Sequence, residues 1–197
     1  MARISVNPAP AVSSRSGSLA RRVGLVILFA ALVSVGSHIR IPIPGNPVPL
    51  TMQVVFVLLA GAFLAPWAAA SAMLLFVGMG VMGAPVFSGG GAGAAYLLGP
   101  TGGYLAGFVL GAFVCSWLVD GRRDSFVRVA LGMTAAVLSI HLLGILHLGF
   151  YLGDWTAAVA SGLSFLLPVD ALKIAAAAAV VIGTSSLFGQ GAGRPGA

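Results

Sequence analysis

The chain has 197 residues, of which 59% are hydrophobic and only 7% are charged, and its mean hydropathy is +1.07. A soluble domain carries roughly 25% charged residues, so the composition excludes a globular protein with a water-facing surface. Much of the apolar surface must face lipid. The formal net charge of +6 does not indicate nucleic-acid binding, because the arginines lie at the ends of apolar runs instead of forming one basic face.

The N-terminal segment combines prolines, serines and two arginines, and it predicts a disordered cytoplasmic tail over residues 1–20. Arg21 and Arg22 then precede an apolar run, which we expect to form the first membrane span. A charged segment before a short apolar stretch also fits a signal peptide. No cleavage site of the A-x-A kind follows, so the membrane span is the favoured interpretation.

A proline-rich segment comes next, HIRIPIPGNPVPLTMQ over residues 38–53, and its four prolines exclude a helix. It predicts an extended connector that overlaps the start of the second span. Pro66 and Trp67 form a tight corner before the third span. The segment 84–104 is rich in glycine, contains two prolines and carries no charge, which indicates an irregular loop.

A charged loop over 120–128 follows the fourth span, and a short interfacial helix is expected within 150–168. The pattern therefore predicts an all-α polytopic membrane protein, in which a six-helix membrane domain covers residues 21–188 and a flexible tail covers 189–197. Abundant Gly, Ala and Ser favour close helix contacts in lipid. The expected spans are 22–37, 50–65, 67–83, 103–119, 129–149 and 169–187.

Basic residues are distributed unequally between the two sides of such a bundle. Six spans place eight of the ten Lys and Arg residues on one side, namely Arg3, Arg15, Arg21, Arg22, Arg122, Arg123, Arg128 and Arg194. The positive-inside rule assigns that side and both termini to the cytoplasm. The three irregular segments then share the outer side. Because irregular backbone at membrane depth is tolerated only where it is buried in protein or lines a cavity, we expect a cavity open to the outside.

The strongest local signal is LLPVDALKI over residues 166–174. Pro168 can begin a helix, which places Asp170 near the N-cap and Lys173 in the first turn on the same face. A cation there opposes the helix dipole. One interpretation is a capping Asp with a Lys that extends to the membrane interface. The other is a ligand site, since ionisable groups at the membrane mark functional positions, and both stay open.

Other chemical features are weaker. The glycine-rich segment has no G-K-[ST] motif, so it is not a P-loop, although its backbone N–H groups could contact a ligand. Arg40 fits either an anionic ligand or lipid headgroups. The three histidines lack metal-ligand spacing, and we interpret His141 and His147 as packing or interfacial residues. No catalytic, ATPase or metal-binding motif is present, and Cys115 is read as a small buried side chain.

Four motifs in order, IPIPGNPVPLTMQ, GAPVFSGGGAG, LLGPTGGYLAGF and LLPVDALK, resemble the BioY family over nearly the whole expected bundle. BioY proteins are biotin-binding substrate components of energy-coupling-factor (ECF) vitamin transporters. The resemblance implies a multi-pass protein of the bacterial cytoplasmic membrane with a biotin pocket facing outward. It also implies a transmembrane coupling protein and ATPase subunits as partners. ATP would be used by those subunits alone, and no cofactor would be bound covalently.

The resemblance suggests roles for particular residues. Asp170 would accept from the ureido N–H groups of biotin, and Lys173 would meet either the ureido carbonyl or the carboxylate. Some family members carry Arg just after the GGY sequence, where this chain has Leu105, so that contact is not inherited. Further ligand contacts are expected from Gly90, Gly91, Tyr104, Gln53, Phe87 and Val86, with Arg40 as a substitute cation.

Other functions remain open at this point. The same architecture could take another vitamin, such as thiamine or riboflavin. A membrane enzyme is disfavoured because the sequence lacks a nucleophile–base pair. A scaffold subunit that binds no small molecule would need neither an ionisable pair at the start of a helix nor three irregular segments on one side.

Overall fold

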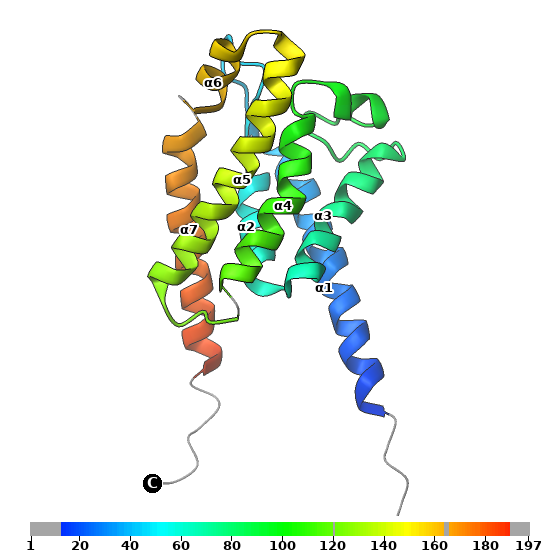
Figure 1. The fold of residues 1–197 in the computed structure, drawn as a ribbon. Coiled ribbons are helices and arrows are strands. Elements are labelled where there is room, and N and C mark those ends of the chain that lie inside the picture. The colour runs from blue at the N-terminus through cyan, green and yellow to red at the C-terminus, as the bar shows by residue number, and fades with distance from the viewer. Residues whose placement is uncertain (1–12, 120, 164–165, 190–197) are drawn as a thin grey trace, which may run out of the picture.

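The structure is a computed structural model, and it describes residues 13–119, 121–163 and 166–189 (Figure 1). Within these residues the chain is helical apart from one small hairpin and its loops. The elements in order are α1 (Ser13–His38), β1 (Arg40–Ile41), β2 (Leu50–Thr51), α2 (Gln53–Phe63), α3 (Pro66–Val81), the 3-10 helix η1 (Ala94–Leu98), α4 (Gly102–Val119), α5 (Phe126–Leu152), α6 (Trp155–Leu163) and α7 (Leu166–Gly189).

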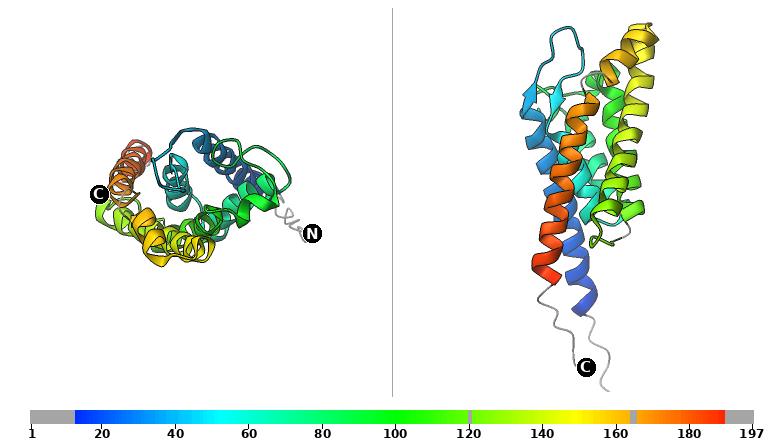
Figure 2. Two further views of the ribbon diagram at one scale, coloured as in Figure 1. Left: turned by 90° about the horizontal axis from the view of Figure 1, so that it is seen from above. Right: turned by 90° about the vertical axis from the view of Figure 1, so that its left-hand side faces the viewer.

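The long helices run back and forth between two ends of an elongated bundle (Figures 1 and 2). The hairpin, the glycine-rich loop with η1, and α6 gather at one end. The α4–α5 loop, the start of α1 and the end of α7 lie at the other. The expected helical membrane bundle is therefore confirmed, and its irregular segments share one end.

Four stretches of the described chain are long and apolar enough to cross a bilayer, and they lie in α1, α4, α5 and the α6–α7 region. Helices α2 and α3 are shorter, with 11 and 16 residues. At 1.5 Å per residue α2 is about 17 Å long, well below the roughly 30 Å of a hydrocarbon core. The start predicted for the second span at residue 50 is wrong, because Leu50 and Thr51 pair with β1.

Other boundaries also differ from the sequence prediction. Helix α1 begins at Ser13, so the end of the expected tail is helical, since no proline follows Pro10 until Pro42. Helix α5 extends to Leu152, where Gly153 ends it with a positive φ of 67°. The remaining expected tails, residues 1–12 and 190–197, lie outside the described residues.

Helix α7 also begins before the predicted residue 169, at Leu166. Proline is tolerated in the first turn of a helix, where its missing N–H has no intrahelical partner, and Pro168 lies there. Asp170 consequently lies inside the helix and not at the N-cap, as does Lys173. The carboxylate is free to bond side chains instead of the backbone.

The proline-rich segment forms a short antiparallel hairpin, in which Arg40 pairs with Thr51 and Ile41 with Leu50. Its tip is attached to α6, because the Asn46 side chain donates to the Ser161 carbonyl at 2.9 Å. The hairpin therefore lies over the same end of the bundle as the short helix that was expected within 150–168.

Small residues bring the helices of the bundle into close contact. Gly107 of α4 lies against Ile140 of α5, where an added Cβ would lie 2.8 Å from the Ile140 Cα. Gly61 of α2 lies against Cys115, which is fully buried. At the opposite end from the hairpin, Arg123 donates to the Ala62 and Phe63 carbonyls at 2.7 and 3.0 Å. These contacts fix α4 against α5 and α2.

We expect Gly107→Ala to lower the thermal stability of the purified protein, since the new methyl group would meet the backbone of Ile140. Forcing a methyl group into a packed contact costs about 1–3 kcal/mol. Gly78→Ala is the matched control, because its added Cβ would meet no atom within 4 Å beyond the neighbouring backbone of its own helix. It should leave the melting temperature unchanged or raise it slightly, as alanine favours helix. Equal effects of the two variants would contradict the close α4–α5 contact.

Candidate ligand-binding site

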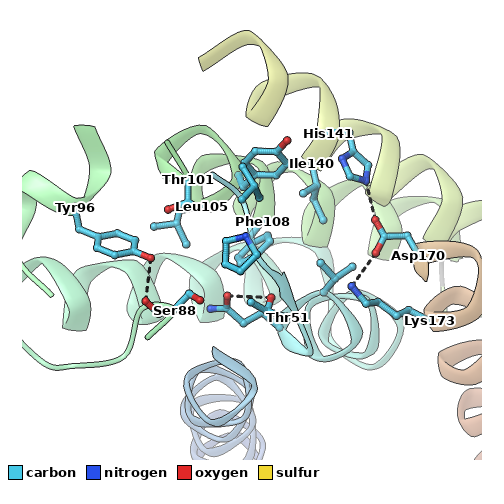
Figure 3. A pocket seen from close by; sticks show the side chains of 15 residues that line it. Thr51, Ser88, Tyr96, Thr101, Leu105, Phe108, Ile140, His141, Asp170 and Lys173 are labelled. Atoms are coloured by element: carbon cyan, nitrogen blue, oxygen red, sulfur yellow. Dashed lines mark hydrogen bonds and ion pairs between the residues drawn. The ribbon is translucent and has the colours of Figure 1, made fainter. Parts of the chain in front are cut away.

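A cavity lies beneath the irregular segments, enclosed by α2, α4, α5, α7, η1, the hairpin and the glycine-rich loop (Figure 3). Its volume is about 50 Å³, enough for several waters at the 10–15 Å³ that each requires. Its lining residues are Val48, Pro49, Thr51, Gln53, Val54, Ser88, Tyr96, Thr101, Tyr104, Leu105, Phe108, Ile140, His141, Asp170 and Lys173.

The polar centre of the cavity is the Asp170 carboxylate on α7. Oδ1 accepts from the Lys173 Nζ at 2.9 Å, and Oδ2 lies 2.7 Å from the His141 Nε2 (Figure 3). All three side chains are buried, with exposed fractions of 2% for Asp170, 8% for Lys173 and 4% for His141. The expectation that Asp170 and Lys173 share one face is confirmed. An ion pair so deeply buried contributes little to stability by itself, which favours a role in ligand binding.

His141 is the residue that sequence reasoning interpreted incorrectly. It projects from α5 and joins Asp170 across 29 positions of sequence, so it is not a simple packing histidine. The signal available in the sequence was a titratable side chain near the middle of a 27-residue apolar helix, where polar groups need a partner. His147 lies on the same helix but bonds the Gly99 carbonyl at 2.9 Å.

Four buried side-chain atoms have no hydrogen-bond partner within the described part of the chain: Gln53 Nε2, Ser88 Oγ, Tyr104 Oη and His141 Nδ1. All four residues line this one cavity. An unsatisfied buried polar group costs roughly 1–3 kcal/mol of folding free energy. Four such groups around one cavity therefore indicate a site that a ligand or water would satisfy. Together they offer donors and acceptors to a small polar molecule.

Apolar side chains form the rest of the wall, with Leu105 and Phe108 from α4 and Ile140 from α5. Val48 and Val54 also line the cavity. A few polar groups converging within apolar walls are characteristic of small-molecule sites. The arrangement suits a ligand that carries hydrogen-bonding groups on an otherwise apolar body.

The predicted ligand residues divide into two groups. Asp170, Lys173, Tyr104 and Gln53 line the cavity together. The second group, Val86, Phe87, Gly90, Gly91 and Arg40, is not part of the lining.

Phe87 is fully buried and packs on Phe76 and Tyr96, with ring centroids 5.6 and 4.8 Å apart. The glycine-rich region instead presents Ser88 and Tyr96 to the cavity, and the Tyr96 hydroxyl donates to the Ser88 carbonyl at 3.2 Å. Arg40 lies outside the lining, with its guanidinium against Gly89. The sequence located the loop correctly but could not show which of its side chains turn inward.

Comparison with known proteins places these features in a family context. Residues 7–190 match the BioY family. The chain is 39% identical over 155 residues to the biotin transporter BioY of Thermotoga maritima, covering 79% of this chain and 90% of the relative. It is 40% identical over 163 residues to a probable biotin transporter BioY of Pyrococcus horikoshii, covering 83% and 94%.

A solved structure, that of the S-component for biotin from an ECF-type ABC transporter, shares the fold. The TM-score is 0.80 at 22% identity, and the match covers 89% of this chain and 95% of that one.

The buried ion pair itself can be tested without any ligand. We expect Asp170→Ala to lower the melting temperature more than the double variant Asp170→Ala/Lys173→Ala does. The single change leaves the Lys173 ammonium buried without its counter-ion, which costs about 3–5 kcal/mol in other proteins, whereas removing both charges avoids that penalty. A double variant that is less stable than either single variant would show that the two groups do not act as a pair.

Proposed function

Since this chain belongs to the BioY family, we propose that it is the biotin-binding membrane component of a vitamin uptake transporter and captures biotin in the cavity around Asp170. One observation supports this function most directly: the Asp170–Lys173 pair and four polar atoms without partners in the described chain line the same cavity, whose other walls are apolar. The function is transport and not catalysis, in keeping with the transporter names of the relatives.

The chemistry of biotin matches these groups. Its ureido ring has two N–H donors and one carbonyl acceptor, its thioether bicycle is apolar, and its side chain ends in a carboxylate. Asp170 accepts from the ureido N–H groups, and Lys173 donates to the ureido carbonyl from the adjacent turn of α7. Leu105, Phe108 and Ile140 cover the bicycle. The Tyr104 hydroxyl and the Gln53 amide lie on the same cavity and supply further hydrogen bonds.

The carboxylate of the ligand needs a separate cation if Lys173 meets the ureido ring. Arg40 is suited to this role, because its guanidinium lies close to Gly89. A Cβ added to Gly89 would be 2.5 Å from one of the guanidinium nitrogens. Gly89 adjoins Ser88, which lines the cavity. Arg40 is exposed, so we propose that the carboxylate lies toward the outer rim, with Gly90 and Gly91 near it.

A cavity of about 50 Å³ is smaller than the roughly 300–1,000 Å³ of small-molecule sites. Biotin therefore enters only if lining segments move. The hairpin pairs two residues on each strand, and its tip is held by the Asn46 bond to the Ser161 carbonyl, so we propose that the hairpin is the segment that separates. Val86 and Phe87 belong to the glycine-rich loop, and we propose that they contact the bound ring.

We further propose that the cavity end faces outward, that both termini are cytoplasmic, and that the membrane is the bacterial cytoplasmic membrane. The partners would be the transmembrane coupling protein and the ATPase subunits of an ECF module, with ATP used by those subunits. On α1, Ile27, Ala31 and Val35 are exposed at a spacing of four residues, and this stripe faces lipid or the coupling protein.

Orientation can be measured by labelling introduced cysteines. Ala92→Cys lies in the glycine-rich loop at the cavity end and Asp124→Cys lies in the α4–α5 loop, and both positions are exposed. The native Cys115 is fully buried, so it gives little background. In intact cells a membrane-impermeant maleimide should label A92C, and should label D124C only after permeabilisation. The reverse pattern would contradict the proposed orientation.

Biotin binding can be measured by calorimetric titration of the purified protein. We expect tight binding by the wild type and at least about tenfold weaker binding by Asp170→Ala and Lys173→Ala, since an unsatisfied buried partner costs about 1–3 kcal/mol and about 1.4 kcal/mol is tenfold. Asp124→Ala, at the opposite end of the bundle, is the control and should bind as the wild type does. If folded wild-type protein does not bind biotin, the proposed function is wrong. If D170A binds biotin with unchanged affinity, the assignment of the binding site to the cavity around Asp170 is wrong.

A further inference from the structure

We propose that a pocket between Arg21 and Arg123 binds the phosphate of an anionic phospholipid. The pocket lies at the end of the bundle opposite the hairpin, where the start of α1 and the end of α7 extend past α2 and α3 (Figure 1). Its volume is about 350 Å³, and its lining residues are Arg21, Phe63, Arg123, Thr184 and Ser185. The inference goes beyond biotin capture and is independent of it, because none of these residues lines the proposed biotin cavity.

The Arg123 side chain is held in place at the end of α2. Its Nε and Nη2 donate to the Ala62 and Phe63 carbonyls at 2.7 and 3.0 Å, and its Cζ lies over the Phe63 ring, 5.1 Å from the ring centre. The loop that carries it is tied to α7, because the Ser185 hydroxyl donates to the Arg123 carbonyl at 2.9 Å. A guanidinium has five N–H donors, so three remain for an anion after these two bonds. Since the side chain is already fixed, it loses little freedom when an anion binds.

The positive charge of Arg123 has no carboxylate partner among the described residues. The side chain is half-buried, and this burial lowers the pKa of Arg123 because the charged form loses solvation. Arg21 of α1 adds a second guanidinium to the pocket, and none of the described lining residues is acidic. Thr184 and Ser185 donate their hydroxyl protons to backbone carbonyls, so the α7 wall is neutral. The pocket therefore has two positive charges that an anion would compensate.

A phosphodiester matches these groups. Its oxygens accept from a guanidinium in a bidentate arrangement, which gives both strength and geometric specificity. One phosphodiester carries one negative charge, so the two arginines keep an excess of one positive charge after it binds. This excess repels the cation of a choline or ethanolamine headgroup. The pocket is therefore suited to a phospholipid whose headgroup adds no positive charge, such as phosphatidylglycerol.

The position of the pocket favours a lipid over a free anion. Basic pockets between the ends of membrane helices attract anionic headgroups at the membrane surface. Helix α2 ends at Phe63 and lies between α1 and α7, in contact with both (Figure 2). Val55, Leu59 and Phe63 of α2 are only partly buried and are spaced four residues apart, so they share one helix face. An acyl chain can follow this apolar stripe into the bilayer while the phosphate stays between the arginines.

The proposal can be tested by native mass spectrometry of the purified full-length protein, titrated in detergent with dioleoyl-phosphatidylglycerol or dioleoyl-phosphatidylcholine. We expect the wild type to bind the first phosphatidylglycerol more tightly than phosphatidylcholine. Arg21→Gln should weaken phosphatidylglycerol binding about fivefold, the loss expected for one arginine at an anionic membrane surface. Arg22→Gln is the matched control, because Arg22 is equally exposed and carries the same charge but does not line the pocket. It should bind phosphatidylglycerol as the wild type does.

Arg123→Lys tests the planar arrangement of donors. It keeps the positive charge, but an ammonium cannot reproduce the guanidinium's bonds to two carbonyls and a phosphate at once. It should weaken phosphatidylglycerol binding at least as much as R21Q does. If R123K does not fold, the comparison of R21Q with R22Q still decides.

Two results would overturn the site, namely equal losses in R21Q and R22Q, or equal affinity of the wild type for the two lipids. Equal affinity would assign the two arginines to an acidic segment of a partner instead. Inorganic phosphate, added at the same concentration as the lipid, separates the two sources of a phosphate group. It should leave phosphatidylglycerol bound, and displacement of the lipid would show that the pocket takes a free anion. Biotin titration of R21Q should match that of the wild type, since Arg21 lies outside the proposed biotin cavity.

Discussion

A carboxylate buried among apolar helices must be matched by cations or hydrogen-bond donors, and Asp170 imposes this constraint on the whole site. Each of its oxygens has a partner, Lys173 from the same helix and His141 from α5. The first partner follows from sequence spacing, since residues three apart share a helix face. The second requires α5 and α7 to pack with matching register. The position of the Asp170 carboxylate therefore depends on how the helices of the bundle pack. Because the side chains around it are apolar, each of its polar contacts is electrostatically stronger than it would be in water.

The proline-rich segment determines where that chemistry is accessible. Its four prolines prevent a helix, so the chain forms a hairpin and α2 begins only at Gln53. A helix of about 17 Å leaves part of the bundle's depth to irregular backbone, which a membrane protein tolerates where the backbone lines a cavity. The first residue of α2 is consequently one of the cavity's polar groups. The shortened helix is thus the structural origin of the cavity.

Sequence reasoning identified what depends on local composition. Apolar runs and prolines predicted the helical bundle and the irregular segments, and the spacing of Asp170 and Lys173 predicted their shared face. It failed where a long-range contact decides. His141 acquires its role only through its position opposite Asp170, 29 residues away. Likewise, which side chains of the glycine-rich loop turn inward depends on Phe87, which packs against Phe76 beneath the loop and leaves Ser88 to face the cavity. No local pattern encodes either contact. The shifted start of α7 has a local cause, the tolerance of Pro168 in a first helical turn, and Leu50 is taken from α2 by its pairing with Ile41.

Capture and access are assigned to different parts of the structure. Tyr104 and His141 project from α4 and α5, which pack closely through Gly107, and His141 joins Asp170 of α7 to them. The hairpin part of the roof is held at its tip by the Asn46 bond to the Ser161 carbonyl, which contributes about 1 kcal/mol. The glycine-rich loop is anchored more firmly, by the buried Phe87 ring on Phe76 and by the His147 bond to the Gly99 carbonyl. Releasing the hairpin therefore costs little beside the hydrogen bonds that a ligand would satisfy below it. A transport component needs this asymmetry, because its ligand must be held firmly by one part of the molecule and released by movement of another.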